Sequence, residues 1–195
     1  CEAAVAVVCA AAADLAVEAV CAAAEASVEA EGDKPNNKTT TQVMEERIKK
    51  AEALFMQGFN CSQSVVAAFA DIYGFTEEQA LKLSAGDGGG IGRMRLTCGA
   101  VCALATLAGM ECGSTDPNDT QGKSACYKLV QEMADSFRNE HGSINCAELL
   151  KLKKDTPLTF QASERTAEYY KSRPCVKQVI SAARIFATYL EEKKQ

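Results

Sequence analysis

The sequence predicts an all-α fold, a compact helical bundle with irregular connections between its helices. Apolar residues recur at helical spacing, for example at Val65, Val66, Phe69 and Ile72, which is the pattern of a helix with one buried face. The segment Thr76-Glu-Glu-Gln79 has the sequence of a capping box at a helix start. The sequence contains no run of alternating β-branched residues bounded by turn residues, which is the pattern typical of a strand.

Three segments follow one another along the chain. Residues 1–31 consist mostly of Ala, Val and Glu, and this composition predicts one Ala-rich helix that ends at Gly32. Residues 32–38 form a linker by composition, and residues 39–195 form the main domain. The first helix has three cysteines on different faces, so it does not build a ligand set by itself. These are Cys1, Cys9 and Cys21.

Within the main domain, apolar periodicity and capping residues predict a series of helices that pack around one core. We predict these helices at about 40–57, 61–73, 76–84, 95–109, 124–140, 146–152, 161–172 and 175–192. Small residues such as Ala100, Ala103, Ala108 and Gly109 allow close packing of helices. We therefore expect a homo-oligomer.

Composition narrows the functions to be considered. The net charge of -5, with basic residues spread among acidic ones, gives no reason to expect a nucleic-acid partner. The longest apolar run, residues 3–13, is too short to cross a bilayer, so we predict no membrane span. The 10 cysteines occur in a chain with enough apolar residues for a core and with no visible export signal. This combination favours a reducing compartment, and we expect a cytoplasmic protein.

Four of the cysteines stand where a helix begins. Asn60-Cys61-Ser-Gln63 and Asn145-Cys146-Ala-Glu148 share one pattern, in which Asn caps the helix and Gln or Glu bonds back. Pro174 precedes Cys175, and a glycine-rich run precedes Cys98. Unpaired N–H groups and the positive end of a helix lower the pKa of a thiol at such positions. We therefore predict a redox or metal site formed by Cys61, Cys98, Cys146 and Cys175.

The glycine-rich loop Gly86-Asp-Gly-Gly-Gly-Ile-Gly92 lacks the motif of a dinucleotide-binding loop or a P-loop. Glycines let a backbone approach other groups closely, so we expect this loop to donate N–H bonds to thiolates or cluster sulfides, and a plain tight turn is the alternative. The loop residues assigned to the site are Gly88, Gly89 and Gly90. Cys102 lies four residues after Cys98 and is either an additional ligand for a soft metal or a core residue.

Several other sites lack their motifs. The chain has one histidine, His141, and no Cys-x-x-Cys or Gly-x-Ser-x-Gly. The sequence therefore lacks the ligand motifs of a zinc finger and of a covalently attached haem, and the catalytic motif of a serine hydrolase. Cys112 and Cys126 flank a polar loop, and we interpret them as structural cysteines.

A family resemblance adds to this interpretation. Asn60-Cys61-Ser-Gln is followed by Gly88-Gly-Gly-Ile-Gly-Arg93, Cys98-Gly-Ala-Val101, Cys146-Ala-Glu-Leu-Leu150 and Cys175. This order resembles the C_GCAxxG_C_C family of redox-active proteins over about residues 42–192, and it implies that these cysteines are the four that define the family. Ala103 stands where the family motif closes with glycine. Related sequence occurs in split-Soret cytochromes c, and that resemblance implies an iron–sulfur centre without the haem.

Three functions follow as hypotheses, and the sequence does not decide whether the protein is an enzyme. The first is an electron-transfer or redox protein whose four helix-start cysteines hold an iron–sulfur cluster, with [2Fe–2S] as the expected type, and serve an unidentified redox partner protein. The second is a thiol–disulfide oxidoreductase in which two of these cysteines cycle. The third is a Cu(I)-binding, cysteine-rich bundle that uses Cys98 and Cys102.

Overall fold

A computed structural model describes residues 38–194, and these residues confirm the all-α fold. The helices are α1 (Thr40–Met56), α2 (Cys61–Phe69), α3 (Glu77–Leu83), α4 (Gly99–Cys112), α5 (Thr120–His141), α6 (Cys146–Leu149), α7 (Ala167–Ser172) and α8 (Cys175–Glu192). Two short 3-10 helices, η2 (Ala70–Tyr73) and η3 (Ala85–Asp87), flank α3. The predicted helix at 1–31 and residues 32–37 of the predicted linker lie outside the described residues.

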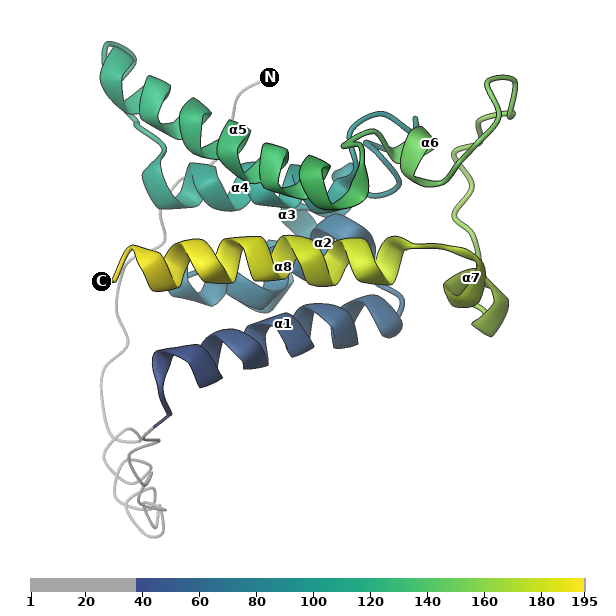
Figure 1. Ribbon diagram of the computed structural model, residues 1–195, viewed down its shortest axis with the longest axis horizontal. Coiled ribbons are helices and arrows are strands. Elements are labelled where there is room, and N and C mark those ends of the chain that lie inside the picture. Colours follow the sequence, from purple (N-terminus) through teal and green to yellow (C-terminus); the bar gives the residue numbers. More distant parts are fainter. Residues whose placement is uncertain (1–37, 195) are drawn as a thin grey trace, which may run out of the picture. The chain divides into compact units, whose positions relative to one another are not determined.

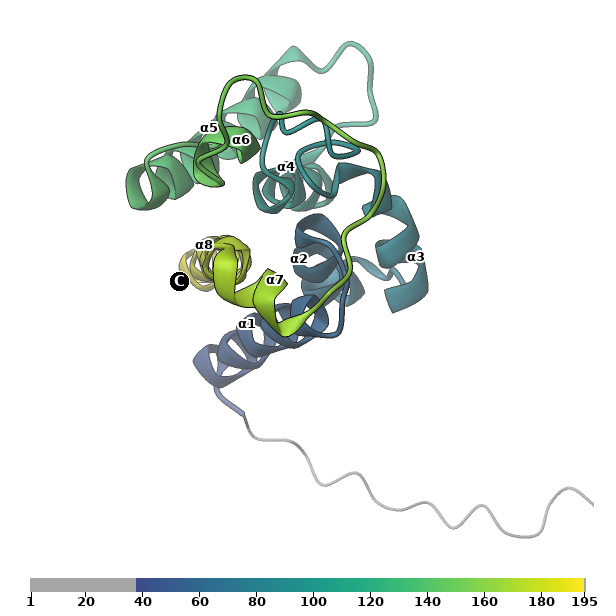
Figure 2. The ribbon, with the colours of Figure 1, turned by 90° about the vertical axis from the view of Figure 1, so that its right-hand side faces the viewer.

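Helix α8 is the central element of the bundle. It packs against α1, α2, α4 and α5, and Figure 1 shows it in yellow between α1 and α5. Figure 2 views the bundle from the side on which α8 begins and on which α6 and α7 lie. Every helix that contacts α8 contributes apolar side chains to one core, because the buried face of an amphipathic helix must find an apolar partner.

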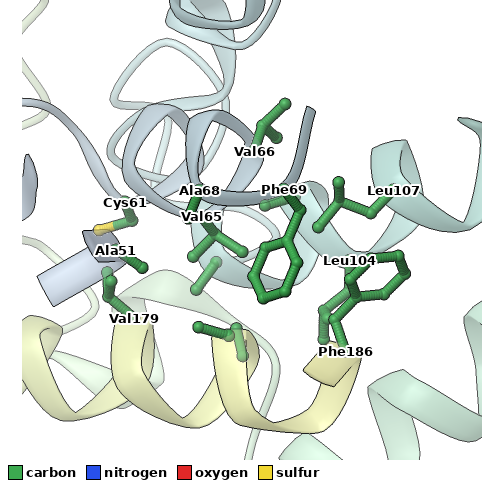
Figure 3. Packing of buried hydrophobic residues seen from close by; sticks show 14 of the residues in the cluster. Ala51, Cys61, Val65, Val66, Ala68, Phe69, Leu104, Leu107, Val179 and Phe186 are labelled. Atoms are coloured by element: carbon green, nitrogen blue, oxygen red, sulfur yellow. The ribbon is translucent and has the colours of Figure 1, made fainter. Parts of the chain in front are cut away.

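The core is built from fully buried aromatic and aliphatic side chains. Phe69 of α2 meets Phe186 of α8 edge to face, with 5.1 Å between ring centroids, and Leu104 of α4 is also fully buried. Figure 3 shows Cys61 at one edge of this cluster, beside Ala51 and Val179. The cluster therefore sets the position of the first residue of α2.

Two predicted helix starts were several residues too early, and the start predicted at 124 was four residues too late, because Asp119 caps the helix that begins at Thr120. The helix predicted from residue 95 begins at Gly99, because Arg95 has a positive φ of 61 and Thr97 forms an isolated bridge with Asn145. The helix predicted from residue 161 begins at Ala167, where Thr166 caps it. In both places a long-range contact or a later cap outweighs local helix propensity.

The small-residue face of α4 is used within this chain. Ala100, Ala103 and Ala108 are fully buried, since α4 packs on α2, α5 and α8. This face therefore gives no separate support to a homo-oligomer, which stays a prediction. No helix within residues 38–194 combines the length and apolar composition that crossing a membrane requires.

Replacing Phe186 by Ala tests the assignment of the core. We expect the free energy of unfolding to fall by about 3–5 kcal/mol, because the change leaves a cavity between α2 and α8. Urea denaturation measures this loss. The control is Phe160→Ala, whose side chain is 89% exposed and whose loss should change stability by less than about 0.5 kcal/mol. Equal effects of the two substitutions would contradict the assignment.

Candidate functional site

The four helix-start cysteines line one cavity. Its volume is about 400 Å³, and its walls come from the starts of α2, α4, α6 and α8 and from the glycine-rich loop before α4. All four cysteines are buried free thiols. The residues that converge here are Cys61, Cys98, Cys146 and Cys175. Each of the four is more than 25 positions in sequence from the next, yet all face the same space, so tertiary packing creates the site. We call it the four-cysteine cavity.

Asparagine caps fix two of these cysteines at the first position of their helices. Asn60 Oδ1 accepts hydrogen bonds from the backbone N–H groups of Ser62 and Gln63, each at 3.0 Å, and Gln63 Oε1 accepts one from Asn60 N. The predicted capping box is therefore confirmed at α2. Cys61 consequently begins a rigid helical turn.

The cap of α6 differs in its return bond. Asn145 Oδ1 accepts from the N–H groups of Ala147 and Glu148, as predicted. The backbone N–H of Asn145, however, donates to Ser143 Oγ at 2.9 Å, and this hydroxyl donates to Glu148 Oε2 at 2.5 Å. The Ser143 hydroxyl thus bridges the Asn145 N–H and the Glu148 carboxylate, which would bond directly to each other in a capping box. Cys146 still occupies the first position of the helix.

A short backbone pairing places Cys98 beside Cys146. Cys98 N donates to Ile144 O at 2.8 Å, and Cys146 N donates to Leu96 O at 2.6 Å. These bonds flank the antiparallel bridge between Thr97 and Asn145. This pairing orders the residues before α4 and before α6, so the first residues of the two helices lie side by side. This pairing was not predicted from the sequence, because a helix was expected across residues 95–98.

Glycines allow the remaining close approaches. A Cβ atom on Gly90 would lie 2.6 Å from Cys146 Cβ, and one on Gly99 would lie 3.3 Å from Cys61 Cβ. Both distances are too short for an ordinary side-chain contact, so these positions accept only glycine without movement. The predicted close approach of the glycine-rich loop is therefore present. The predicted N–H bonds from Gly88, Gly89 and Gly90 to sulfur stay a prediction, because no hydrogen bond from this loop to a thiol occurs in the described residues.

Four arginines that were not predicted from the sequence also line the cavity. They are Arg93, Arg95, Arg165 and Arg173. None of them forms an ion pair within residues 38–194, and no Asp or Glu of these residues lines the cavity. Uncompensated positive charge beside thiols stabilises the thiolate form. The cavity is therefore suited to negatively charged sulfur.

Hydrogen bonds and aromatic rings hold these guanidinium groups in place. Arg95 Nη1 lies 3.9 Å from Cys146 Sγ and 3.4 Å from Gly89 O. The guanidinium groups of Arg165 and Arg173 lie 4.4 and 4.6 Å from the ring centre of Tyr169. Cation–π contacts stabilise a cation without neutralising it, so the charge remains available to the cavity. Two arginines around one tyrosine, together with Arg-x-Arg after the glycine loop, are the sequence signal that could have revealed them.

Arg93 connects the cavity to the extended segment between α6 and α7. Its Nε donates to Thr159 O at 3.0 Å, and its Nη1 donates to Ser163 Oγ at 3.1 Å. Figure 2 shows this segment running in green from α6 to α7. The segment contributes Phe160 to the wall of the cavity, so a loop without helical structure completes the site.

The thiols differ in pKa. The expected lowering at helix starts is found at Cys175, whose pKa is about 7, first because the Cys61 thiol donates a hydrogen bond to it and then because of Arg173, Arg165 and Arg95. The expectation is wrong for the other three. The same hydrogen bond, followed by burial, raises the pKa of Cys61, and burial raises the pKa of Cys98 to about 12.

Burial also raises the pKa of Cys146, although Arg95 acts in the opposite direction. Loss of water is therefore the main cause of the raised pKa at Cys98 and Cys146, whereas at Cys61 the hydrogen bond with Cys175 comes first. The site contains one acidic thiol, Cys175, and one thiol that donates to it, Cys61.

Other candidate residues lie outside the four-cysteine cavity. Cys102 Sγ points to Thr97 O at 3.8 Å, and Cys98 Sγ lies 3.9 Å from Gln178 Oε1. Cys98 is the N-cap, and its backbone angles, φ -55 and ψ 133, are not helical, so the two thiols do not share a helical face as predicted. His141 packs on Phe137 at the end of α5. Cys1, Cys9 and Cys21 lie outside the described residues.

The four thiols line one cavity, but their sulfur atoms do not have the spacing of ligands to one metal group. Within residues 38–194, no group of three or more Cys, His, Asp or Glu side chains has the geometry to hold a metal ion. The donor set and the absence of carboxylates from the cavity nevertheless fit a four-thiolate group. Binding such a group requires the sulfur atoms to move closer by side-chain rotation.

Comparison with known proteins gave one family. A profile of the family described as "Putative redox-active protein (C_GCAxxG_C_C)" matches residues 59–189. The matched range exceeds half of the chain and contains all four cysteines of the cavity. No curated protein and no solved structure gives a significant match.

Replacing Gly90 by Ala tests the packing between the glycine loop and Cys146. We expect a loss of stability larger than that of Gly92→Ala, measured by urea denaturation. Gly92 is in the same loop and also has a positive φ, but a Cβ there meets nothing within 4 Å, so its cost of about 1–2 kcal/mol is the backbone cost alone. The Gly90 substitution adds about 1–3 kcal/mol of overpacking. Similar losses for the two variants would contradict the close approach.

The pKa of Cys175 predicts a pH profile for alkylation of the metal-free protein. Because only the thiolate reacts, the rate at Cys175 should rise with pH and reach half its maximum near pH 7, as the pKa of about 7 requires. Mass spectrometry of iodoacetamide-treated peptides measures the rate. Cys61→Ala removes the donor and should move the midpoint upward, whereas Cys102→Ala should not. A midpoint near that of a free thiol, about 8.5, would show that the hydrogen bond is absent.

Proposed function

This chain belongs to the C_GCAxxG_C_C family, and we propose that its four-cysteine cavity holds an iron–sulfur cluster, of the [2Fe–2S] type, for electron transfer. The observation that supports this proposal is the convergence of four buried thiols from four helix starts on one cavity. Structural cysteines would be expected to lie apart, each in its own part of the core. Four cysteine thiolates are also the usual ligand set of such a cluster.

A bound cluster supplies one-electron oxidation and reduction, and the chain supplies its surroundings. The four cysteines would be the ligands. The cavity of about 400 Å³ gives space for a small inorganic group. Because each cysteine is at a helix start next to a glycine loop or a cap, side-chain rotation can bring the sulfurs together without unwinding a helix.

Electrostatics favours a negatively charged group in this position. A [2Fe–2S] cluster with four thiolates carries net negative charge in both oxidation states. Arg95 Nη1 lies 3.9 Å from Cys146 Sγ, and three further arginines line the same space. Positive charge near a cluster stabilises the added electron and raises the reduction potential. The arginines therefore both retain the cluster and tune it.

A second function has one observation in its favour. Cys61 and Cys175 line the same cavity, and the pKa of Cys175 is lowered to about 7, first through a hydrogen bond from Cys61. A neighbouring pair with one acidic thiol is the arrangement of a thiol–disulfide oxidoreductase. In this function Cys175 would attack a disulfide and Cys61 would resolve the mixed disulfide. No observation within residues 38–194 favours the Cu(I) hypothesis, because Cys98 and Cys102 point to different partners.

Anaerobic reconstitution with iron and sulfide tests the proposal. We expect brown protein that contains iron and acid-labile sulfide, and we expect Cys98→Ala to lose both to a large extent. Cys102→Ala is the matched control, because its thiol is on the same helix and outside the cavity, and it should retain the cluster. Colourless, iron-free protein in which Cys61 and Cys175 form a disulfide would instead support the second function.

A further inference from the structure

A second pair of thiols lies outside the four-cysteine cavity. Cys112 is the last residue of α4, and Cys126 lies in the second turn of α5. Cys112 Sγ is 3.2 Å from the carbonyl oxygen of Ala108, and Cys126 Sγ is 3.9 Å from the same oxygen. Burial, and next a hydrogen bond with Cys126, raises the pKa of Cys112 to about 11. Two thiols that share one acceptor and contact each other are close enough for a covalent bond after small side-chain rotations.

Both thiols are free and partly exposed, so a small oxidant can reach them. The four cysteines of the cavity are buried by comparison. The polar loop of residues 113–119 joins the two helices, so the sequence separation is short and closing the ring orders few additional residues. These features distinguish the pair from structural cysteines inside the core.

We propose that Cys112 and Cys126 form a second redox couple, which a low-molecular-weight disulfide such as oxidised glutathione converts to an intramolecular disulfide. One thiol, as its thiolate, attacks the small disulfide and releases one molecule of thiol. The other thiol then attacks the mixed disulfide, forms the bond between Cys112 Sγ and Cys126 Sγ, and releases the second molecule. The chain loses two hydrogens and two electrons, and the small disulfide is reduced to two thiols.

This couple is distinct from the cavity. Helix α4 has 14 residues, so at about 1.5 Å per residue Cys98 and Cys112 are separated by roughly 20 Å along the helix. The surroundings also differ. Glu111, next to Cys112, accepts a hydrogen bond from Tyr73 Oη at 2.5 Å and pairs with Lys193 beyond α8. A disulfide would therefore link the end of α4 to α5. Tyr73 of η2 and Lys193 beyond α8 contact the same end of α4 through Glu111.

Treatment of the full chain with oxidised glutathione tests the inference. Free thiols are then blocked with iodoacetamide, and the peptides are digested without reduction and analysed by mass spectrometry. We expect a cross-linked peptide joining Cys112 to Cys126 in the majority of chains, and its loss on addition of dithiothreitol. We also expect the oxidised chain to melt at a higher temperature, because the disulfide restricts the unfolded chain.

Variants give the deciding comparison. In Cys126→Ala, Cys112 should accumulate a stable mixed disulfide with glutathione, several-fold above the wild-type level, because the resolving thiol is gone. Cys102→Ala, with a partly exposed thiol on the same helix, should leave the cross-link unchanged. Circular dichroism establishes that each variant folds. Equal mixed disulfide at Cys112 in the wild type and in Cys126→Ala, with no cross-link, would overturn the inference.

Discussion

Four buried sulfur atoms in one cavity can carry negative charge only if nearby positive charge replaces the water that they have lost. Burial is the main cause that raises the pKa of Cys98 to about 12, which would keep such a thiol neutral. The chain supplies four arginines at the same cavity and no carboxylate from residues 38–194. Their position depends in turn on Tyr169, which two guanidinium groups contact, and on the extended segment that Arg93 binds. The irregular part of the fold is thus arranged around the electrostatics of the site.

The geometry of the site follows from helix starts. Asn60 caps α2 and Asn145 caps α6, so local sequence decides where each cysteine stands in its helix. Packing decides where the helices lie: α8 crosses the core through the contact between Phe69 and Phe186, and the pairing of Thr97 with Asn145 joins the other two starts. A mutation far from sulfur, in the core or in this pairing, would therefore alter the distances between the thiols.

Sequence predicted the parts of the structure that local interactions determine. The caps at Asn60 and Thr76 were predicted because a capping box involves residues only three positions apart. The start of α4 was not, because the conformation of residues 95–98 depends on a segment about fifty residues further along the chain. The arginines were missed for the same reason: they come from two distant segments and have no helical periodicity. The contact between Cys112 and Cys126 likewise arises from the packing of α4 on α5, and neither thiol has a motif of its own.

The central claim is that the four thiols of the cavity bind one cluster together. Native mass spectrometry of the anaerobically reconstituted chain tests it most directly, because mass distinguishes the two proposed functions in one measurement. The account predicts a chain heavier by two irons and two sulfides, and loss of that added mass when any one of Cys61, Cys98, Cys146 and Cys175 is replaced by Ala. A chain without added iron, lighter by two hydrogens because Cys61 and Cys175 have formed a disulfide, would contradict it.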